Sequence, residues 1–158
     1  MKVRDLMTRD VVVLNANSPL ISAQEVMGLR RVRHLPCVED KKFVGLITHR
    51  ELLRAYLPSG SLLEQKMHAS RTRVRELMHT DVATVTEDTE LTEAAELLRN
   101  HKWGCLPVVN DQGKLTGIVT DADFLYLARV TIELLAESEP GLLDKLRDRL
   151  GDGAPSDA

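Results

Sequence analysis

The stretch LPCVEDKKFVGLITHRE, residues 35–51, decides the fold because the chain contains it twice. It returns at residues 106–123 as LPVVNDQGKLTGIVTDAD, which keeps the Leu-Pro-x-Val start and the Gly-x-x-Thr-x-x-acid end. One extra residue falls in the polar segment 111–113, where a turn tolerates an insertion. The chain is therefore an internal duplication, and each copy predicts the structure of the other.

The duplication extends towards the N-terminus, where Val3–Met7 (VRDLM) returns 71 residues later as Val74–Met78 (VRELM). Apolar residues recur at helical spacing in the middle of each copy, and β-branched runs flank that helix on both sides. In the first copy we expect a short helix ending near Met7, a strand at 11–13, a helix capped by Ser18 with Pro19 in its first turn, strands at 35–38 and 43–47, and a helix over about 50–57. In the second copy we expect a strand at 82–85, a helix capped by Thr89, strands at 106–109 and 115–119, and a helix over about 121–136.

Each copy is too small to bury its own apolar surface. A unit of about 55 residues with a small sheet and helices on one side leaves one face exposed, so the two copies should pack together. The predicted fold class is α/β (α+β), with two pseudo-symmetric βαββα repeats packed sheet to sheet. The expected domains are repeat 1 at 1–57, a partly helical linker at 58–73, repeat 2 at 74–136, an amphipathic C-terminal helix at 137–150 and a disordered tail at 151–158.

Composition argues against several classes of function. The formal net charge of −3 disfavours nucleic acid or a membrane surface as the main partner. The start of the chain has no apolar signal region, and no apolar run approaches the roughly 18 residues of a membrane span, so we expect a cytoplasmic protein. Cys37 and Cys105 lie far apart and outside any metal-ligand spacing, which predicts neither a disulfide nor a metal site. No catalytic motif is present, so we expect no enzyme and no catalytic residues.

The duplicated motif resembles the two halves of a CBS-domain pair, over about Val3 to Ala128. No flanking catalytic or channel domain accompanies it, so the chain resembles a stand-alone CBS-pair protein. The resemblance implies a regulatory module that binds an adenine nucleotide in the cleft between the repeats. AMP, ADP or ATP is the expected ligand, with S-adenosylmethionine or NAD as alternatives and no catalytic cofactor. It also implies a homodimer and a regulated protein that the sequence does not identify.

A main nucleotide site is predicted around Thr120 and Asp123. A threonine at a strand end, three residues before a carboxylate, places a hydroxyl and free backbone N–H groups at a helix N-terminus, where phosphate is favoured. The carboxylate can accept hydrogen bonds from the ribose hydroxyls. The resemblance implies that residues of the other repeat complete this site, with the basic ones on the phosphates. These residues are Val12, Val32, Arg33 and His34.

A second site is predicted from the other half of the motif, with Thr48 and Glu51 in the corresponding roles. The resemblance adds Ala83, Trp103 and Gly104 to it, and Trp103 could stack on a base or fill space. This half departs from the pattern, because Glu51 is longer than aspartate and because Gly104 and Cys105 stand where the first copy has Arg33 and His34. We therefore expect the second site to be weaker, empty or suited to a different ligand.

Structural interpretations compete with these assignments. Thr48 and Thr120 could be ordinary N-caps, and the acids that follow them could only complement the helix dipole. The basic run Arg30–His34 could be a solvated face. The alternative function is a protein-interaction or dimerisation module whose nucleotide sites are vestigial.

Overall fold

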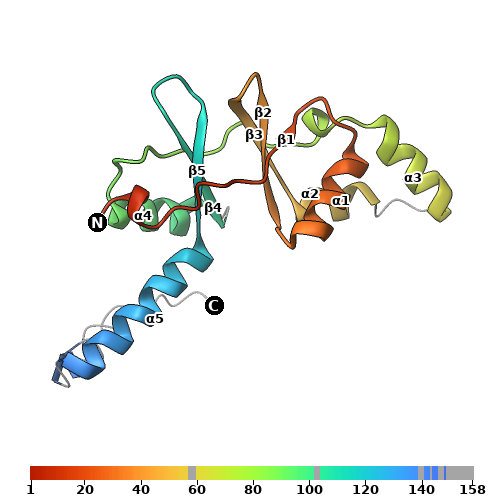
Figure 1. Ribbon diagram of the computed structural model, residues 1–158. Coiled ribbons are helices and arrows are strands. Elements are labelled where there is room, and N and C mark those ends of the chain that lie inside the picture. The colour runs from red at the N-terminus through yellow and green to blue at the C-terminus, as the bar shows by residue number, and fades with distance from the viewer. Residues whose placement is uncertain (57–59, 102–103, 139–140, 143, 146–147, 149–158) are drawn as a thin grey trace. The chain divides into compact units, whose positions relative to one another are not determined.

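The computed structural model describes residues 1–56, 60–101, 104–138, 141–142, 144–145 and 148 (Figure 1). The chain divides into two compact units, Met1–Thr120 and Asp121–Ala158, which are described separately. The C-terminal helix expected at 137–150 lies partly outside the described residues, and the tail expected at 151–158 lies wholly outside them.

The first repeat forms a three-stranded sheet with two helices. Strand β1 is parallel to β2, and β2 forms an antiparallel hairpin with β3, so the strand order is β1-β2-β3. Asp40 and Lys41 make the hairpin turn, both with positive φ. The elements are β1 (Leu14–Asn15), α1 (Leu20–Arg30), β2 (His34–Glu39), β3 (Lys42–Thr48) and α2 (His49–Tyr56).

The second repeat keeps the hairpin and its preceding helix. It consists of α4 (Leu91–His101), β4 (Cys105–Val109) and β5 (Leu115–Thr120), with β4 antiparallel to β5. Helix α3 (Leu62–Arg71) follows the first repeat in the sequence and falls within the segment predicted as a partly helical linker. It begins with a capping box in which Ser61 and Glu64 satisfy each other's backbone N–H groups. Helix α5 (Asp121–Ser138) belongs to the second unit.

The first strand of each repeat is shorter than predicted, and in the first repeat it also lies further along the chain. Residues 11–13 are not in a strand, and the pairing with β2 occurs at Leu14–Asn15 instead. In the second repeat, the predicted strand 82–85 is reduced to a single bridge between Val85 and Val108. The β-branched residues serve packing rather than pairing: Val11 packs on the cluster shared by the two sheets, whereas Val12 packs on the core of the first repeat.

The predictions that Ser18 and Thr89 cap helices α1 and α4 are wrong. Pro19 is the N-cap of α1 and makes no side-chain cap, so Ser18 does not fill that role. The Thr89 hydroxyl accepts from Thr86 N, outside α4. Backbone carbonyls from distant segments accept hydrogen bonds from the first residue of each helix instead. Leu20 N donates to Thr72 O at 2.9 Å, and Leu91 N donates to Met1 O at 3.0 Å.

These carbonyls belong to two opening segments, residues 1–8 and 72–79, and each opening segment pairs with the other repeat. Thr8 forms a two-way backbone bridge with Ile118 of β5, with N···O distances of 2.9 and 3.0 Å. His79 forms the equivalent bridge with Leu46 of β3, with both distances 2.8 Å. The repeats are therefore joined by an exchange of their first residues.

The motif glycines permit this exchange because the opening segments lie against them. A β-carbon on Gly45 would lie 2.7 Å from the carbonyl oxygen of His79. A β-carbon on Gly117 would lie 2.7 Å from Met7 Sδ and 3.0 Å from Thr8 O. Real β-carbons essentially never lie within 3.0 Å of other atoms, so both glycines reflect the close approach of an opening segment, by its backbone at Gly45 and chiefly by the Met7 side chain at Gly117.

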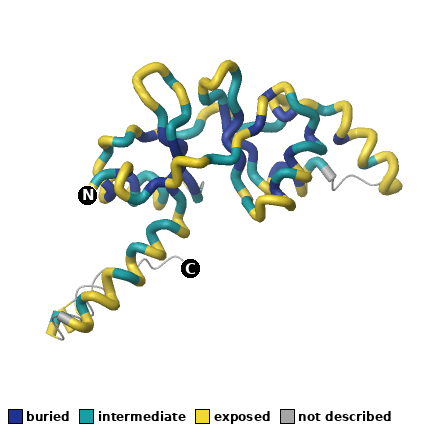
Figure 2. The backbone as a smooth tube through the Cα atoms, in the orientation of Figure 1, coloured by how far each residue is buried: buried dark blue, intermediate teal, exposed yellow. Residues whose placement is uncertain are grey.

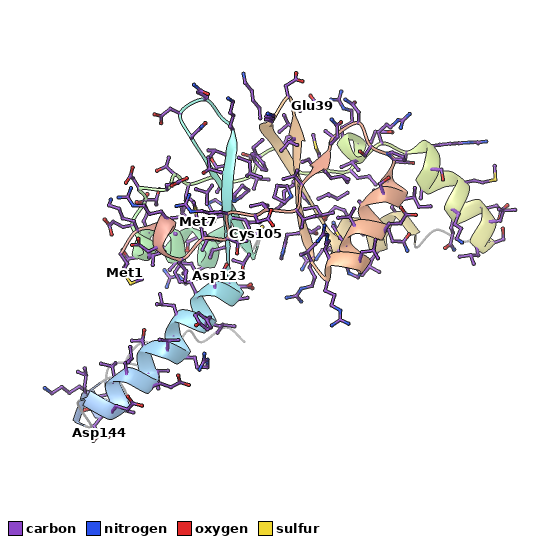
Figure 3. All side chains as sticks on the ribbon, viewed as in Figure 1. Met1, Met7, Glu39, Cys105, Asp123 and Asp144 are labelled. Atoms are coloured by element: carbon purple, nitrogen blue, oxygen red, sulfur yellow. The ribbon has the colours of Figure 1, made fainter. Side chains whose placement is uncertain are left out.

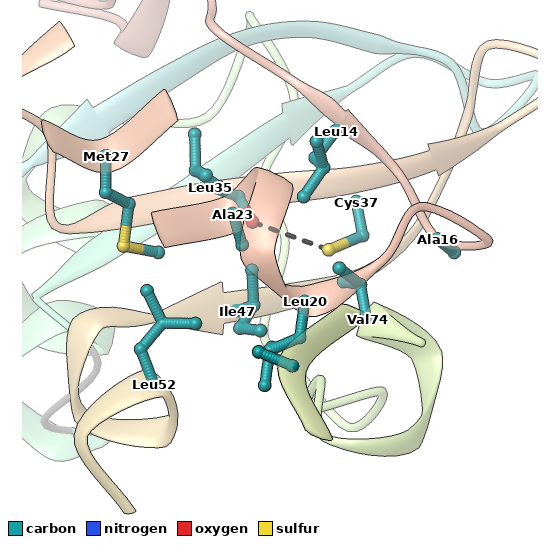
Figure 4. Packing of buried hydrophobic residues seen from close by; sticks show 11 residues of the cluster. Leu14, Ala16, Leu20, Ala23, Met27, Leu35, Cys37, Ile47, Leu52 and Val74 are labelled. Atoms are coloured by element: carbon teal, nitrogen blue, oxygen red, sulfur yellow. Dashed lines mark hydrogen bonds between the residues drawn. The ribbon is translucent and has the colours of Figure 1, made fainter. Parts of the chain in front are cut away.

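The core of the first repeat lies between its sheet and helices α1, α2 and α3, where buried residues gather (Figures 2 and 4). Val74 of the second opening segment joins this cluster. Burial raises the pKa of the Cys37 thiol to about 12, although a backbone hydrogen bond at Ile47 acts in the opposite direction. A smaller buried cluster of Leu46, Cys105 and Ile118 joins the two sheets. The larger cluster contains Leu14, Ala16, Leu20, Ala23, Met27, Leu35, Cys37, Ile47, Leu52, Ala69 and Val74.

Candidate functional site

Thr48 and Glu51 meet at the junction of β3 and α2. Thr48 ends the strand, and Glu51 lies in the first turn of the helix with only 7% of its surface exposed. Glu51 Oε2 accepts from Thr48 N at 3.1 Å and also from the Thr48 hydroxyl. The interaction with Thr48 N is that of an N3 glutamate in a capping box. The structure thus brings together two residues of the predicted second site, and it also supports their structural interpretation.

A third residue, His79, reaches the same carboxylate from the second opening segment. His79 Nε2 lies 3.0 Å from Glu51 Oε1, and the Arg54 guanidinium lies 3.9 Å from the same oxygen. Burial by itself would raise the pKa of Glu51, but hydrogen bonds from Thr48 and His79 and the charge of His79 together hold that pKa below its usual value. Glu51 is therefore an ionised, buried carboxylate with protein donors on both oxygens.

Sequence reasoning missed His79. The offset of 71 residues between the repeats makes His79 the counterpart of Thr8, so the sequence does show that the two positions are equivalent. Its contact with Glu51 depends on the bridge between Leu46 and His79, which no local pattern encodes.

The other members of the predicted second site are placed as follows. Ala83 is half-buried in the segment before Val85. Gly104 lies directly before β4 with φ of 75°, a conformation that favours glycine. Trp103 lies outside the described residues.

The main-site residues fall in both units. Thr120 ends β5, half-buried and opposite Cys105 in the hairpin register. Asp123 lies in the first turn of α5, in the second unit (Figure 3). Its grouping with Thr120, Val12, Val32, Arg33 and His34 stays a prediction.

Val32 and Arg33 line a cavity of about 530 Å³ in the first repeat. Arg33 is held there by its backbone, because its carbonyl accepts from His49 N at 2.9 Å at the start of α2. His34, the next residue, is half-buried and faces Thr48 in the β2–β3 register. Thr120 is not among the residues that line the cavity, which are Gln24, Met27, Gly28, Arg31, Val32, Arg33, His49, Leu52 and Leu53.

The lining of this cavity combines cationic and apolar groups. Arg31 and Arg33 supply guanidinium groups, and His49 supplies an imidazole, beside the apolar side chains of Met27 and Leu52. Arginine offers paired donors that match phosphate oxygens, and its charge persists at all physiological pH values. The cavity volume lies within the range of small-molecule sites. It suits an anion that carries an apolar body.

Within the described ranges, no group of three or more His, Cys, Asp or Glu side chains could hold a metal ion. No helix in that part of the chain combines the length and apolarity needed to cross a membrane.

Comparison with solved structures identifies proteins of the same architecture. The chain is similar to AcuB of Vibrio cholerae, named for acetoin utilization, with 40% identity, a TM-score of 0.73 and coverage of 89% of this chain and 98% of that one. It is similar to Arabidopsis thaliana CBSX2, solved in complex with AMP, with 29% identity, a TM-score of 0.70 and coverage of 80% and 95%. It is also similar to the CBS domain pair of MJ0100, solved with 5′-methylthioadenosine and S-adenosyl-L-methionine, with 25% identity, a TM-score of 0.70 and coverage of 83% and 98%.

Among curated proteins, the chain matches parts of longer relatives. It is 31% identical over 120 residues to the inosine-5′-monophosphate dehydrogenase of Thermoplasma acidophilum, and this match covers 76% of the chain but 22% of the enzyme. The next two relatives are covered to 42% and 45% of their length. The chain thus spans less than half of each of these three proteins.

The CBS domain family model matches twice, at residues 3–58 and 74–129. Both matches begin at an opening segment, Val3 or Val74, and each includes one Gly-x-x-Thr-x-x-acid motif. Together they cover most of the chain and agree with the duplicated hairpins of the structure. The chain belongs to the CBS domain family and carries two CBS repeats.

Proposed function

We propose that this CBS pair is a regulatory module that binds an adenine nucleotide in the cleft between its repeats. Two similar CBS-pair structures support the ligand class, since one contains AMP and the other contains adenosyl compounds. AMP, ADP or ATP is the proposed ligand, and S-adenosylmethionine and NAD are the alternatives.

The cavity beside Arg33, which residues of the first repeat line, is the observation that supports the class of ligand, and the contribution of the second repeat to the site is part of the proposal. It places Arg31, Arg33 and His49 next to an apolar wall that includes Val32 and Leu52. An adenine nucleotide has the matching parts: a flat base that gains from apolar contact and phosphates that gain from charge-assisted hydrogen bonds. Arg33 is the residue that we assign to the phosphates.

We propose the same residues for the main site as the sequence predicts. Thr120 would donate to a phosphate, Asp123 would accept from the ribose hydroxyls, and Val12, Val32, Arg33 and His34 would complete the site. The second site, with Thr48 and Glu51, is the weaker one, because Thr48 and His79 already occupy the Glu51 carboxylate.

Regulation requires that the ligand distinguish two states of the module. A nucleotide can shift an equilibrium only by its difference in affinity for those states. We propose that binding changes the packing of the repeats or the geometry of a homodimer, and that a partner protein in the cytoplasm senses this change. The module itself catalyses no reaction in this proposal.

A thermal-shift panel tests the function directly. A ligand that binds only the folded chain raises the midpoint of unfolding by an amount that grows with its concentration over Kd. AMP, ADP, ATP, NAD and S-adenosylmethionine should be compared with inorganic phosphate as the control. A rise with at least one adenine compound supports the proposal, whereas no rise with any of them favours an interaction module with vestigial sites.

A further inference from the structure

Donors of its own chain approach both oxygens of the buried Glu51 carboxylate, which can accept about four hydrogen bonds. Thr48 donates to Oε2 through both its backbone N–H and its hydroxyl, and His79 Nε2 lies 3.0 Å from Oε1. Only 8% of the Glu51 side chain is exposed. A ribose hydroxyl must reach one of these oxygens, and the His79 imidazole covers Oε1, the oxygen that Thr48 does not contact.

The backbone of His79 is held by hydrogen bonds, whereas its side chain is partly exposed to solvent. The two hydrogen bonds with Leu46 and the close approach to Gly45 hold the main chain. The side chain, in contrast, is 36% exposed, so it can rotate towards solvent without disturbing that bridge. The Glu51–His79 contact can therefore break while the repeats stay joined.

The first opening segment lacks this contact because its equivalent residue is different. Thr8 makes the equivalent backbone bridge, to β5, and lies against the equivalent glycine, Gly117, but its side chain is short and exposed. The duplication thus supplies an internal reference in which histidine is replaced by threonine on the same backbone.

We infer that His79 keeps the second site closed: its imidazole occupies the Glu51 oxygen that a ribose hydroxyl would need, and a nucleoside binds there only after the imidazole leaves. This inference rests on the proposed function, since it takes a ribose-bearing ligand as the competitor. The apparent affinity is reduced by the fraction of molecules in which the imidazole is displaced. Hydrogen bonds to charged groups have strengths that correspond to a ten- to hundred-fold change in affinity, to order of magnitude.

The test removes the imidazole and measures nucleoside binding at Glu51 alone. Asp123→Ala suppresses the proposed main site, and His79→Thr or the control His101→Thr is added to that chain. His101 is an exposed histidine at the end of α4. Each protein is titrated calorimetrically with adenosine, which needs no phosphate-binding charge at the Gly104 position, and with 2′,3′-dideoxyadenosine, which lacks the ribose hydroxyls.

We expect His79→Thr to bind adenosine about ten- to hundred-fold more tightly than its parent, with no gain for dideoxyadenosine and none in His101→Thr. Equal affinity of His79→Thr and its parent, or a gain that dideoxyadenosine shares, would overturn the inference. If the melting curve shows that His79→Thr is unfolded, His79→Asn replaces it with the same expectation, because asparagine is too short to reach Glu51.

The proposed function can fail separately. Titration of the wild-type chain with AMP tests that proposal, and a chain that binds no AMP would refute it. The comparison of His79→Thr with its parent is still decided in that case by adenosine.

Discussion

The two opening segments share a backbone arrangement but differ in the side chain that each delivers. Both bridge a strand of the other repeat and both lie against a motif glycine. One delivers Thr8, whose side chain is exposed, and the other delivers His79, which contacts a buried carboxylate. The shared positions account for the joining of the repeats, and the unshared position is the one to which we attribute the closure of the second site.

The largest expected effect comes from the motif glycines. In Gly45→Ala the new methyl group meets a backbone oxygen, which cannot move freely, whereas in Gly117→Ala it meets chiefly the flexible end of Met7. We expect losses in the free energy of unfolding of about 3 kcal/mol for Gly45→Ala and about 1 kcal/mol for Gly117→Ala, as for overpacked sites. Urea denaturation measures both.

Gly28→Ala is the matched control for these variants. Gly28 lies within α1, and nothing lies within 4 Å of its added β-carbon. This substitution should stabilise the chain by roughly 0.5–1 kcal/mol through helix propensity. Equal losses at Gly45 and Gly117 would show that the two opening segments are packed alike.

The second largest effect concerns how the stability of the chain depends on pH through Glu51, at the junction of β3 and α2. The pKa of Glu51 is lower in the folded chain than in the unfolded chain. Its contribution to stability is therefore fully present above the unfolded pKa and is lost as the pH falls through the folded pKa. Glu51→Gln should cost roughly 2 kcal/mol at neutral pH, as expected for lost hydrogen bonds to a charged group, and should flatten the acid limb of stability against pH.

Glu64→Gln provides the control for acid sensitivity. Glu64 makes the same capping box with Ser61, and that interaction likewise lowers its pKa, but it lies on the surface at the start of α3. Solvent screens an exposed interaction, so this variant should change the acid limb less than Glu51→Gln does. The opposite order would show that burial of Glu51 and its contact with His79 add nothing.

The smallest effect concerns the exposed ion pairs of the first opening segment. Arg4 lies 2.9 Å from Asp88 and Lys2 lies 3.3 Å from Glu90, all on the surface. Arg4→Gln should lower the urea midpoint slightly at low salt and not at 1 M salt, where the screening length is about 3 Å. A large loss that persists in salt would show that packing, not charge, holds Arg4.

The sequence predicted the parts of the fold that the duplication and local turn chemistry encode. The hairpins at Leu35–Ile47 and Leu106–Val119, and the helices that precede them, follow from repeated motifs and periodicity. The strand predicted at 11–13 was wrong because its valines pack on two different clusters and leave pairing to Leu14 and Asn15. The helix caps were wrong because distant carbonyls, at Thr72 and Met1, satisfy the first N–H groups.

The same distinction holds for the candidate sites. The meeting of Thr48 with Glu51 was predictable, since the two residues lie one helical turn apart. The contact of His79 with Glu51 was not, because it depends on the register of a bridge between segments far apart in the chain. The cavity beside Arg33 likewise depends on how α1 and α2 pack.

Calorimetric titration with AMP tests the central claim most directly. The wild-type chain, Asp123→Ala and the control Asp121→Ala, whose exposed carboxylate accepts from Ala122 N, should be compared. We predict one AMP per wild-type chain, the same in Asp121→Ala, and loss of most of the affinity in Asp123→Ala with its melting curve unchanged. Undiminished binding in Asp123→Ala, or no binding by the wild-type chain, would contradict the account.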